Sequence, residues 1–468
     1  MSGAEELLAG PRPADAIARA VRAGSVKARA VAAAALARIR AANPTINAFT
    51  TVTEKRALAE AEAVDAAIAG GADPGPLAGV PYAVKDLIDV AGLATLAGSK
   101  INRARPPAVR DGAVVRRMHA AGAVLVGALN MGEYAYDFTG ENAHNGPSRN
   151  PRDPERMSGG SSGGSGAAVA AGMVALALGS DTNGSIRVPS SLCGIFGLKP
   201  TFGRVSRAGS FPFVASLDHL GPFARSARDL ALAYDALHGF DADDPVSAEQ
   251  PHEPAAAELE RGVDGLRIAV AGGYFEQGGA PEAHDAVATV ARALGAERRV
   301  VLPQAHRARA AAYVITTAEG GALHLERLKQ RAEDFDPATR DRFIAGALTP
   351  AAWYVQAQRF RRWYRDRVRE AIADVDILLA PATPVTAPKI GQEKMTIGGV
   401  EMLVRPNLGI FTQPISFVGL PVAVAPLPRP GAMPIGVQII AKPWREREAL
   451  RVAFELERRG IAAAPAAG

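Results

Sequence analysis

The sequence predicts an α/β protein in which one β-sheet, covered by helices, forms a single large domain. Short apolar strands alternate with helical segments between residues 266 and 302, which is typical of a sheet with covering helices. Hydrophobic residues make up 48% of the 468-residue chain and charged residues 22%, as in a globular protein with a large core. We find no internal repeat and no composition change that marks a boundary, so residues 1–468 are expected to form one domain.

The N-terminal segment, about residues 1–70, is expected to be largely helical. Ser25 is placed to cap a helix that runs to about Ala42, where Asn43-Pro44 should end it. Residues 46–52 alternate like a strand, and a helix rich in Ala and Glu follows to about Ile68.

The later elements are predicted from apolar periodicity and turn residues. Helices are expected at 226–238, 282–294, 306–329 and 350–373, and strands at 266–270, 299–302 and 376–381, with a helix and a strand within 111–129 and two strands within 411–440. The polar stretch 132–157 contains aromatic residues, so it is expected to be an ordered and functional loop.

Composition excludes several classes of protein. The net charge of +5 is mildly basic, but the dense basic segment 359–369 is interrupted by Asp366 and is better interpreted as a solvated helix face than as a nucleic-acid surface. Cys193 is the single cysteine, so neither an intrachain disulfide nor a cysteine metal cluster is possible, and we expect it to be buried. The N-terminus lacks a signal peptide pattern, and the apolar run 166–179 is too short for a bilayer. A cytoplasmic protein is expected.

Two segments rich in Gly and Ser, 158–165 and 180–187, stand on either side of the apolar run 166–179. We expect them to be two loops held apart by one buried element, and to form the active site. A P-loop is excluded because no lysine follows these glycines before Lys199. A dinucleotide fingerprint is disfavoured because residues 152–157 do not resemble a strand.

Two kinds of serine chemistry remain open. Residues 160–164 fit the G-x-S-x-G pattern, which would make Ser162 a nucleophile assisted by a later histidine such as His219. Alternatively, Lys85 is a base. Its pKa would then have to fall from about 10.4 to near 7, which costs roughly 4 to 5 kcal/mol. Lys85 is either a solvent-facing lysine of an edge strand or a lysine buried beside a cleft.

Long motifs in residues 159–165, 179–189 and 193–201 closely resemble the amidase signature family. The resemblance extends to Gly79-Val80-Pro81, Lys85-Asp86, residues 129–134 and Pro381-Ala382-Thr383-Pro384, so it covers most of the chain. It implies a mixed central β-sheet covered on both faces by helices, with a signature core at about 77–205.

The resemblance also implies a Ser-cisSer-Lys triad and neither a metal nor a cofactor. Ser185 would be the nucleophile, Ser161, after a cis peptide, the bridging serine, and Lys85 the general base. The backbone N–H groups that would hold the oxyanion belong to Thr182, Asn183, Gly184 and Ser185. Many family members have Gly where this chain has Asn183, whose amide is also placed to reach the substrate. Arg187 is expected to form a structural ion pair with a neighbouring acid.

Residues 97–103, 136–144, 319–325, 352–354 and 358–362 resemble one subgroup of this family. The resemblance implies removal of a terminal amide from a small anionic ureido compound such as 1-carboxybiuret. It also implies a small helical partner like the C subunit of the tRNA-dependent amidotransferase, in a dimer or heterotetramer, with neither nucleic acid nor membrane as a partner. Residues that are candidates for the pocket are Tyr136, Asn142, His144 and Arg359.

Other activities stay open at this point. The substrate could be another ureido or oxamate-like amide, as in purine catabolism, or the chain could be a general amidase. It could also be the A subunit of a glutamyl-tRNA amidotransferase, or an interaction subunit without activity.

Overall fold

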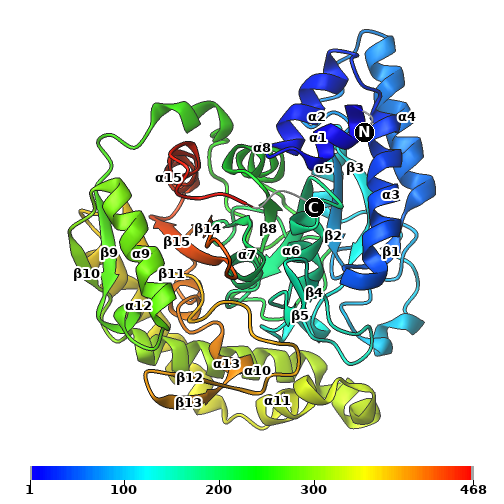
Figure 1. The fold of residues 1–468 in the computed structure, drawn as a ribbon. Helices are drawn as coiled ribbons and strands as arrows, with labels where there is room; N and C mark the ends of the chain where they lie inside the picture. Colours follow the sequence, from blue (N-terminus) through cyan, green and yellow to red (C-terminus); the bar gives the residue numbers. More distant parts are fainter. Residues whose placement is uncertain (1–2, 465–468) are drawn as a thin grey trace.

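The computed structural model describes residues 3–464, and their centre is one mixed β-sheet of eleven strands (Figure 1). The strand order across the sheet is β1-β3-β2-β6-β8-β7-β14-β15-β11-β9-β10. The strands are β1 (Phe49–Val52), β2 (Pro81–Lys85), β3 (Val124–Leu129), β6 (Leu176–Asp181), β7 (Phe196–Lys199), β8 (His219–Ala224), β9 (Ile268–Gly272), β10 (Arg299–Val301), β11 (Ile377–Pro381), β14 (Val422–Leu427) and β15 (Ile435–Ala441). Two small hairpins lie outside this sheet: β4 (Arg149–Asn150) with β5 (Asp153–Met157), and β12 (Lys394–Ile397) with β13 (Val400–Leu403).

The sheet combines two parallel groups with an antiparallel centre. β2 is parallel to both of its neighbours, β3 and β6, and β9 is parallel to β10 and β11. The strands between these groups pair antiparallel. The predicted mixed sheet with covering helices in a single domain is therefore confirmed.

Helices cover the sheet on both sides and extend beyond one end. The helices are α1 (Gly3–Ala9), α2 (Pro13–Arg22), α3 (Ala28–Ile46), α4 (Glu54–Ala69), α5 (Ala113–Ala120), α6 (Gly163–Ala170), α7 (Arg187–Cys193), α8 (Ala227–Leu237), α9 (Pro281–Leu294), α10 (Ala305–Arg331), α11 (Pro337–Ala347), α12 (Ala351–Ala371), α13 (Val404–Asn407), α14 (Gln413–Ser416) and α15 (Glu446–Arg458). The 3-10 turns are η1 (Lys100–Ala104), η2 (Glu133–Ala135), η3 (Ala256–Arg261), η4 (Gly273–Glu276) and η5 (Ala332–Asp334).

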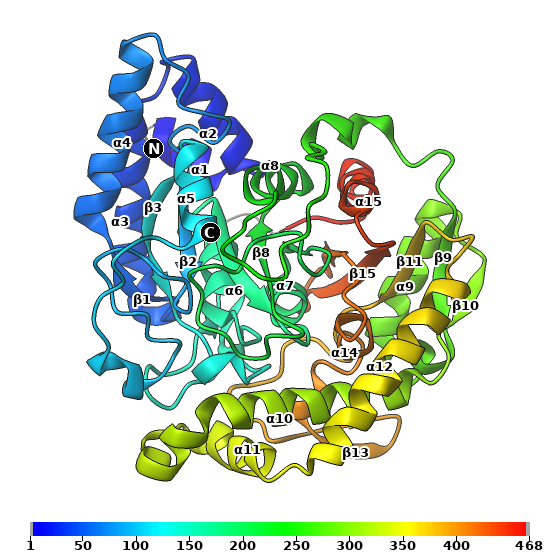
Figure 2. The same ribbon diagram turned by 180° about the vertical axis from the view of Figure 1, so that it is seen from behind.

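Most of these helices fall into four groups in space. α8 and α15 pack on one side of the central strands, and α6 and α7 on the other (Figure 1). The N-terminal helices α1–α4 lie at the β1 end, and α10, α11 and α12 form a separate helical layer (Figure 2). Amphipathic sequences explain this packing: α2, for example, buries Ile17 and Val21, which are one turn apart. No helix within residues 3–464 is both long and apolar enough to cross a membrane.

Both predicted ends of the first long helix are wrong. Ser25 is not a cap, because α3 begins at Ala28 and the Ser25 hydroxyl donates to the Ala20 carbonyl. The N–H of Ala28 is instead satisfied by the carboxylate of Asp65, at 2.8 Å. Pro44 lies within the last turn, and the helix ends only at Asn47 in a left-handed conformation. These ends depend on residues distant in the sequence, which local capping rules do not include.

The prediction of two loops around one buried element is also wrong. The apolar run contains α6, a turn and β6, and residues 163–165 of the first Gly/Ser segment already belong to α6. Gly164 permits this packing, since a Cβ there would lie 2.5 Å from the Ala48 carbonyl oxygen. Residues 153–157, predicted not to be a strand, form β5.

Candidate active site

The position of Lys85 follows from the strand order. It is the last residue of β2, which lies between β3 and β6, so the interpretation as an edge-strand lysine is wrong. Its side chain is fully buried. β2 and β6 run parallel and end side by side, and in α/β sheets the carboxyl ends of parallel strands are where functional groups gather.

Two hydroxyl groups contact the amine of Lys85. Its Nζ lies 2.6 Å from Oγ of Ser161 and 2.8 Å from Oγ of Ser180. Burial lowers the pKa of Lys85 to about 7, although the carboxylates of Asp218 and Asp181 oppose this. Near neutral pH about half of the molecules therefore hold a neutral amine that can accept a proton from Ser161.

Ser161 belongs to the turn that leads into α6. The peptide bond between Gly160 and Ser161 is cis. The turn is held by backbone hydrogen bonds: the Gly160 N–H donates to Phe138, and the Ser161 carbonyl accepts from Gly132. These contacts fix the hydroxyl of Ser161 against Lys85.

Ser185 lies in the turn between β6 and α7, at the same end of the sheet. It forms no hydrogen bond with Ser161 in the described chain, so the structure pairs Lys85 with Ser161 but shows no direct link from either to Ser185. Gly184, at φ 145°, is required here because a Cβ would lie 2.3 Å from Oγ1 of Thr412. No described residue accepts a hydrogen bond from the backbone N–H groups of residues 182–185, which leaves these donors available.

A narrow pocket opens at this turn. It is lined by Ala135, Tyr136, Asp137, Phe138, Thr182, Asn183, Ser185, Phe213, Tyr313, Thr316, Arg342 and Gln413. In the pocket wall, Nδ2 of Asn183 donates to Oγ1 of Thr316 at 2.8 Å, while Oδ1 of Asn183 is buried without a partner among the described residues.

Arg187 has a structural role, as the sequence predicted. It is fully buried, and its Nε and Nη2 atoms lie 3.0 and 2.9 Å from the two carboxylate oxygens of Asp181. Burial opposes ionisation of Asp181, but Arg187 outweighs this and holds its pKa well below the ordinary value. Another guanidinium N–H donates to Gln438 on β15. The ion pair thus joins the two ends of the turn that contains Ser185, and the contact with Gln438 ties this turn to β15.

Comparison with known proteins identifies the family. A sequence model described as Amidase matches residues 30–450. The chain belongs to the amidase family. It is therefore a hydrolase that acts on amide C–N bonds.

This amidase is similar to several named proteins and solved structures. It is 56% identical over 445 residues to the AtzE subunit of 1-carboxybiuret hydrolase from Pseudomonas sp. (strain ADP), covering 94% of this chain and 97% of the relative. It is 38% identical to the A subunit of the glutamyl-tRNA(Gln) amidotransferase from Carboxydothermus hydrogenoformans, covering 93% and 95%. A solved structure described as "An unexpected vestigial protein complex reveals the evolutionary origins of an s-triazine catabolic enzyme" superposes with a TM-score of 0.95 at 55% identity, covering 96% of this chain and 99% of the other.

The structure of this amidase does not support the alternative in which Ser162 is a nucleophile assisted by a histidine. The Ser162 hydroxyl donates to the Ser180 carbonyl at 3.1 Å, and no described histidine contacts it. Nδ1 of His219 pairs with the carbonyl of Asp181 instead, at 3.0 Å, and burial holds the pKa of His219 well below its ordinary value. Cys193 is buried, as predicted, and its thiol donates to the Ser158 carbonyl at 3.2 Å.

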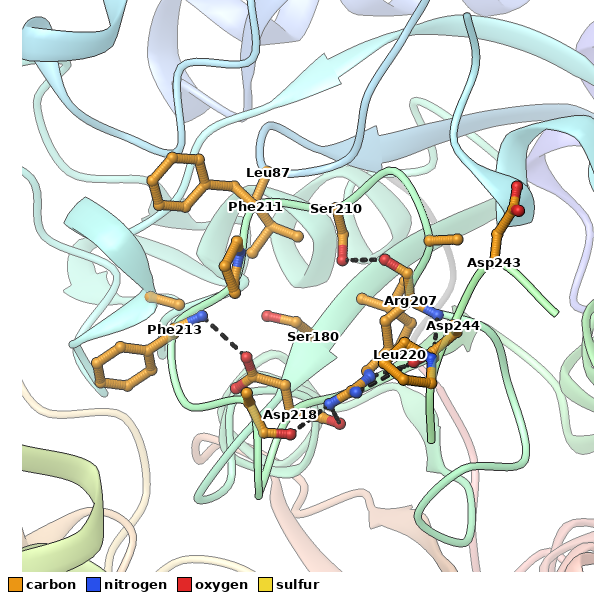
Figure 3. A pocket seen from close by; sticks show the side chains of 15 residues that line it. Leu87, Ser180, Arg207, Ser210, Phe211, Phe213, Asp218, Leu220, Asp243 and Asp244 are labelled. Atoms are coloured by element: carbon orange, nitrogen blue, oxygen red, sulfur yellow. Dashed lines mark hydrogen bonds and ion pairs between the residues drawn. The ribbon is translucent and has the colours of Figure 1, made fainter. Parts of the chain in front are cut away.

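A second cavity reaches Ser180 from the side of residues 207–220 (Figure 3). Its volume is about 180 Å³. The carboxylate of Asp218 faces it and accepts hydrogen bonds from the Phe213 N–H and the Thr182 hydroxyl, at 2.8 and 2.6 Å. Burial raises the pKa of Asp218. Asp218 therefore links this cavity to the turn that contains Ser185.

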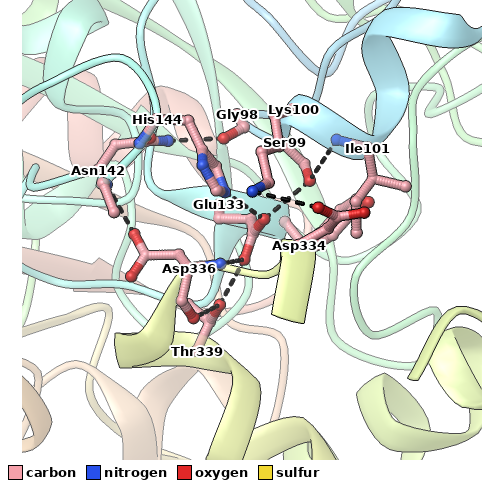
Figure 4. A network of polar contacts seen from close by, with 12 residues as sticks. Gly98, Ser99, Lys100, Ile101, Glu133, Asn142, His144, Asp334, Asp336 and Thr339 are labelled. Carbon is pink, nitrogen blue, oxygen red and sulfur yellow. Dashed lines mark hydrogen bonds and ion pairs between the residues drawn. The ribbon is translucent and has the colours of Figure 1, made fainter. Parts of the chain in front are cut away.

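The loop after β3 is ordered by one buried carboxylate (Figure 4). Glu133 accepts hydrogen bonds from Ser99, His144 and Thr339, and from the backbone N–H of Asp336, at 2.6 to 2.9 Å. Thr339 and Asp336 belong to the start of α11, so Glu133 joins this helix to the signature core.

The four candidate pocket residues have different positions. Tyr136 lines the pocket, whereas His144 pairs with Glu133, and Asn142 donates to the carbonyls of residues 98 and 131. Arg359 is exposed on α12, away from the pocket.

Three residues of the site were not predicted from the sequence: Ser180, Asp218 and Arg342. Ser180 lies within the recognised motif 179–189, at the end of β6, so a hydroxyl at a strand end was a usable signal. Asp218 and Arg342 lie in segments without a motif, and only the fold brings them to this end of the sheet.

Proposed function

We propose that this amidase hydrolyses the terminal carboxamide of a small ureido compound of the 1-carboxybiuret class and releases ammonia. The observation that carries the proposal is the 56% identity with the 1-carboxybiuret hydrolase relative over nearly the full length of both chains. The amidotransferase relatives reach only 38% over a similar length.

In the proposed mechanism, Oγ of Ser185 attacks the carbonyl carbon of the terminal amide. The proton of Ser185 passes to Ser161 as Ser161 gives its own proton to neutral Lys85. The contact of 2.6 Å between Lys85 and Ser161, and the lowered pKa of Lys85, support this relay. The unpartnered N–H groups of residues 182–185 support an oxyanion hole in this turn.

Collapse of the tetrahedral intermediate breaks the C–N bond. The proton held by Lys85 returns through Ser161 to the departing nitrogen, so ammonia leaves as a neutral molecule. Water then attacks the acyl carbonyl carbon and gives a proton through Ser161 to neutral Lys85. The bond between the acyl carbon and Oγ of Ser185 breaks, the proton returns through Ser161 to Oγ of Ser185, and the acid product leaves. Lys85 and Ser161 thus act first as base and then as acid in each half of the reaction.

A partner protein is part of the proposal. We infer that a small helical protein similar to the amidotransferase C subunit binds this chain in a dimer or heterotetramer, in the cytoplasm. The inference is supported by the neighbouring structure, which is described as a vestigial protein complex. Gel filtration of the chain alone and with a coexpressed partner tests it. A fully active monomer would contradict the need for a partner.

The function is tested by ammonia release from 1-carboxybiuret, biuret, allophanate, oxamate and glutamine. We expect the highest kcat/KM with 1-carboxybiuret. The Ser185→Ala variant should release no ammonia from it. A preference for glutamine would indicate an amidotransferase component instead, and a preference for oxamate would indicate a different small-amide hydrolase.

A further inference from the structure

One polar atom at the pocket beside Ser185 has no role in the proposed mechanism. Asn183 lines this pocket together with Ser185, which follows it by two residues in the same turn. Asn183 is 6% exposed, and its Oδ1 atom is buried without a hydrogen-bond donor among the described residues. Buried acceptors in native proteins nearly always have a partner, so an unpaired acceptor in a pocket wall indicates a donor that a ligand supplies.

The Asn183 side chain is held in one orientation. Its Nδ2 atom donates to Oγ1 of Thr316 on α10 at 2.8 Å, and the Asn183 backbone carbonyl accepts from the Thr412 hydroxyl at 2.6 Å. Both threonines are buried. Because Nδ2 is engaged by Thr316, Oδ1 is the end of the amide that is left for another partner.

The backbone does not explain why an Asn stands at this position. Asparagine is favoured in turns where φ is positive. Asn183 does not have a positive φ, whereas its neighbour Gly184 has a φ of 145°. The conformational requirement of the turn is therefore met by Gly184, and the side chain of Asn183 is left with a role in contacts.

Donors in the pocket wall do not serve Oδ1. The Thr182 hydroxyl donates to Asp218, and Nη1 of Arg342 donates to the Tyr136 carbonyl. Since Asn183 is two residues from the proposed nucleophile, its Oδ1 atom is placed for an atom bonded to the attacked carbonyl carbon. In a ureido compound the atom on the acyl side of that carbon is an N–H nitrogen, and in an ordinary carboxamide it is an alkyl carbon.

We propose that Oδ1 of Asn183 accepts a hydrogen bond from the N–H group on the acyl side of the attacked carbonyl carbon, and so makes the enzyme select ureido compounds over alkyl amides. A CH2 group at that position leaves the buried acceptor unpaired, which is the physical basis of the selection. The proposal rests on the proposed function, which makes Ser185 the nucleophile and the terminal carboxamide its target. It adds the residue that recognises the ureido group.

The experiment compares two ligands that differ only at this position. N-carbamoyl-β-alanine and glutaramate have the same terminal carboxamide, charge and chain length, but the group beside the carboxamide carbon is N–H in the first and CH2 in the second. Calorimetry measures both dissociation constants in the Ser185→Ala background. We expect N-carbamoyl-β-alanine to bind about 10- to 100-fold more tightly, and Asn183→Ala to bring this ratio close to one.

Two threonines of α10 provide a matched pair of variants. Thr316→Val removes the acceptor that holds Nδ2 and should lower the ratio in part, whereas Thr317→Val should keep it, because the Thr317 hydroxyl donates only to carbonyls within α10. If Asn183→Ala does not fold, the comparison of these two variants decides. An unchanged ratio in a folded Asn183→Ala variant would overturn the proposal. So would an equal loss of affinity for both ligands, which would mean that Oδ1 contacts the terminal amide that they share.

Failure of the proposed function is detected separately, by ammonia release from 1-carboxybiuret in the unsubstituted enzyme. If no ammonia is released, the proposed function fails, and a binding ratio that depends on Asn183 still supports recognition of the N–H group. If ammonia is released but Ser185→Ala with Asn183 intact binds both ligands equally, the proposed function stands and the role of Asn183 is overturned.

Discussion

The dependence of activity on pH follows from the burial of Lys85 and can be worked out in advance. A buried amine with a pKa of about 7 is neutral in about a tenth of the molecules at pH 6, half at pH 7 and nine tenths at pH 8. Since the neutral amine is the base, kcat/KM should rise about tenfold from pH 6 to pH 8 and then level off. The difference from an ordinary lysine corresponds to about 5 kcal/mol.

The assay is ammonia release at low substrate concentration across pH 5.5 to about 10, with melting temperatures measured at each pH to exclude unfolding. A lysine of ordinary pKa would give a rate that still rises about tenfold per pH unit at pH 9. That result, or activity of Lys85→Ala restored at high pH, would refute the role of Lys85 as the base. Asp218→Asn removes a negative charge that raises the pKa of Lys85, so its profile should shift to lower pH.

Three further substitutions test separate parts of the site. Ser161→Ala should lower kcat about 10²- to 10⁴-fold with an unchanged melting temperature, and wild-type kinetics would exclude the bridging role. Arg187→Met should cost about 3 to 5 kcal/mol in denaturant unfolding because it leaves Asp181 buried and unpaired; adding Asp181→Asn should recover part of this, and an unchanged stability would contradict the account. Glu133→Gln should cost about 1 to 3 kcal/mol because the oxygen that becomes NH2 no longer accepts from its two donors, whereas Glu333→Gln, which is exposed, should be neutral; equal effects would argue against the network.

The sequence predicted the mixed α/β fold, the family, the structural ion pair of Arg187 and the burial of Cys193. It could do so because the motifs are long and because apolar periodicity marks most strands and helices. It did not decide whether Lys85 was buried or exposed, since that depends on β2 lying between β3 and β6. The family resemblance, and not the residue pattern, favoured the interpretation of Lys85 as a buried general base.

The features that could not be predicted correctly from the sequence depend on contacts between segments that are distant in the sequence. The cap of α3 comes from Asp65, 37 residues after Ala28, and the small residues that begin α6 resemble a loop until Ala48 packs against them. Arg342 has no motif and reaches the pocket because α11 packs on α10 and is joined to the core by Glu133. Local rules do not contain such information.

The central claim is that Ser185 carries the acyl group during amide hydrolysis. Rapid acid quench of the enzyme with 1-carboxybiuret, followed by peptide mass spectrometry, tests it most directly. We expect the mass of the acyl group on the peptide that contains Ser185, and its loss in Ser185→Ala. An adduct on Ser162 or another residue, with Ser185 unmodified, would contradict the claim.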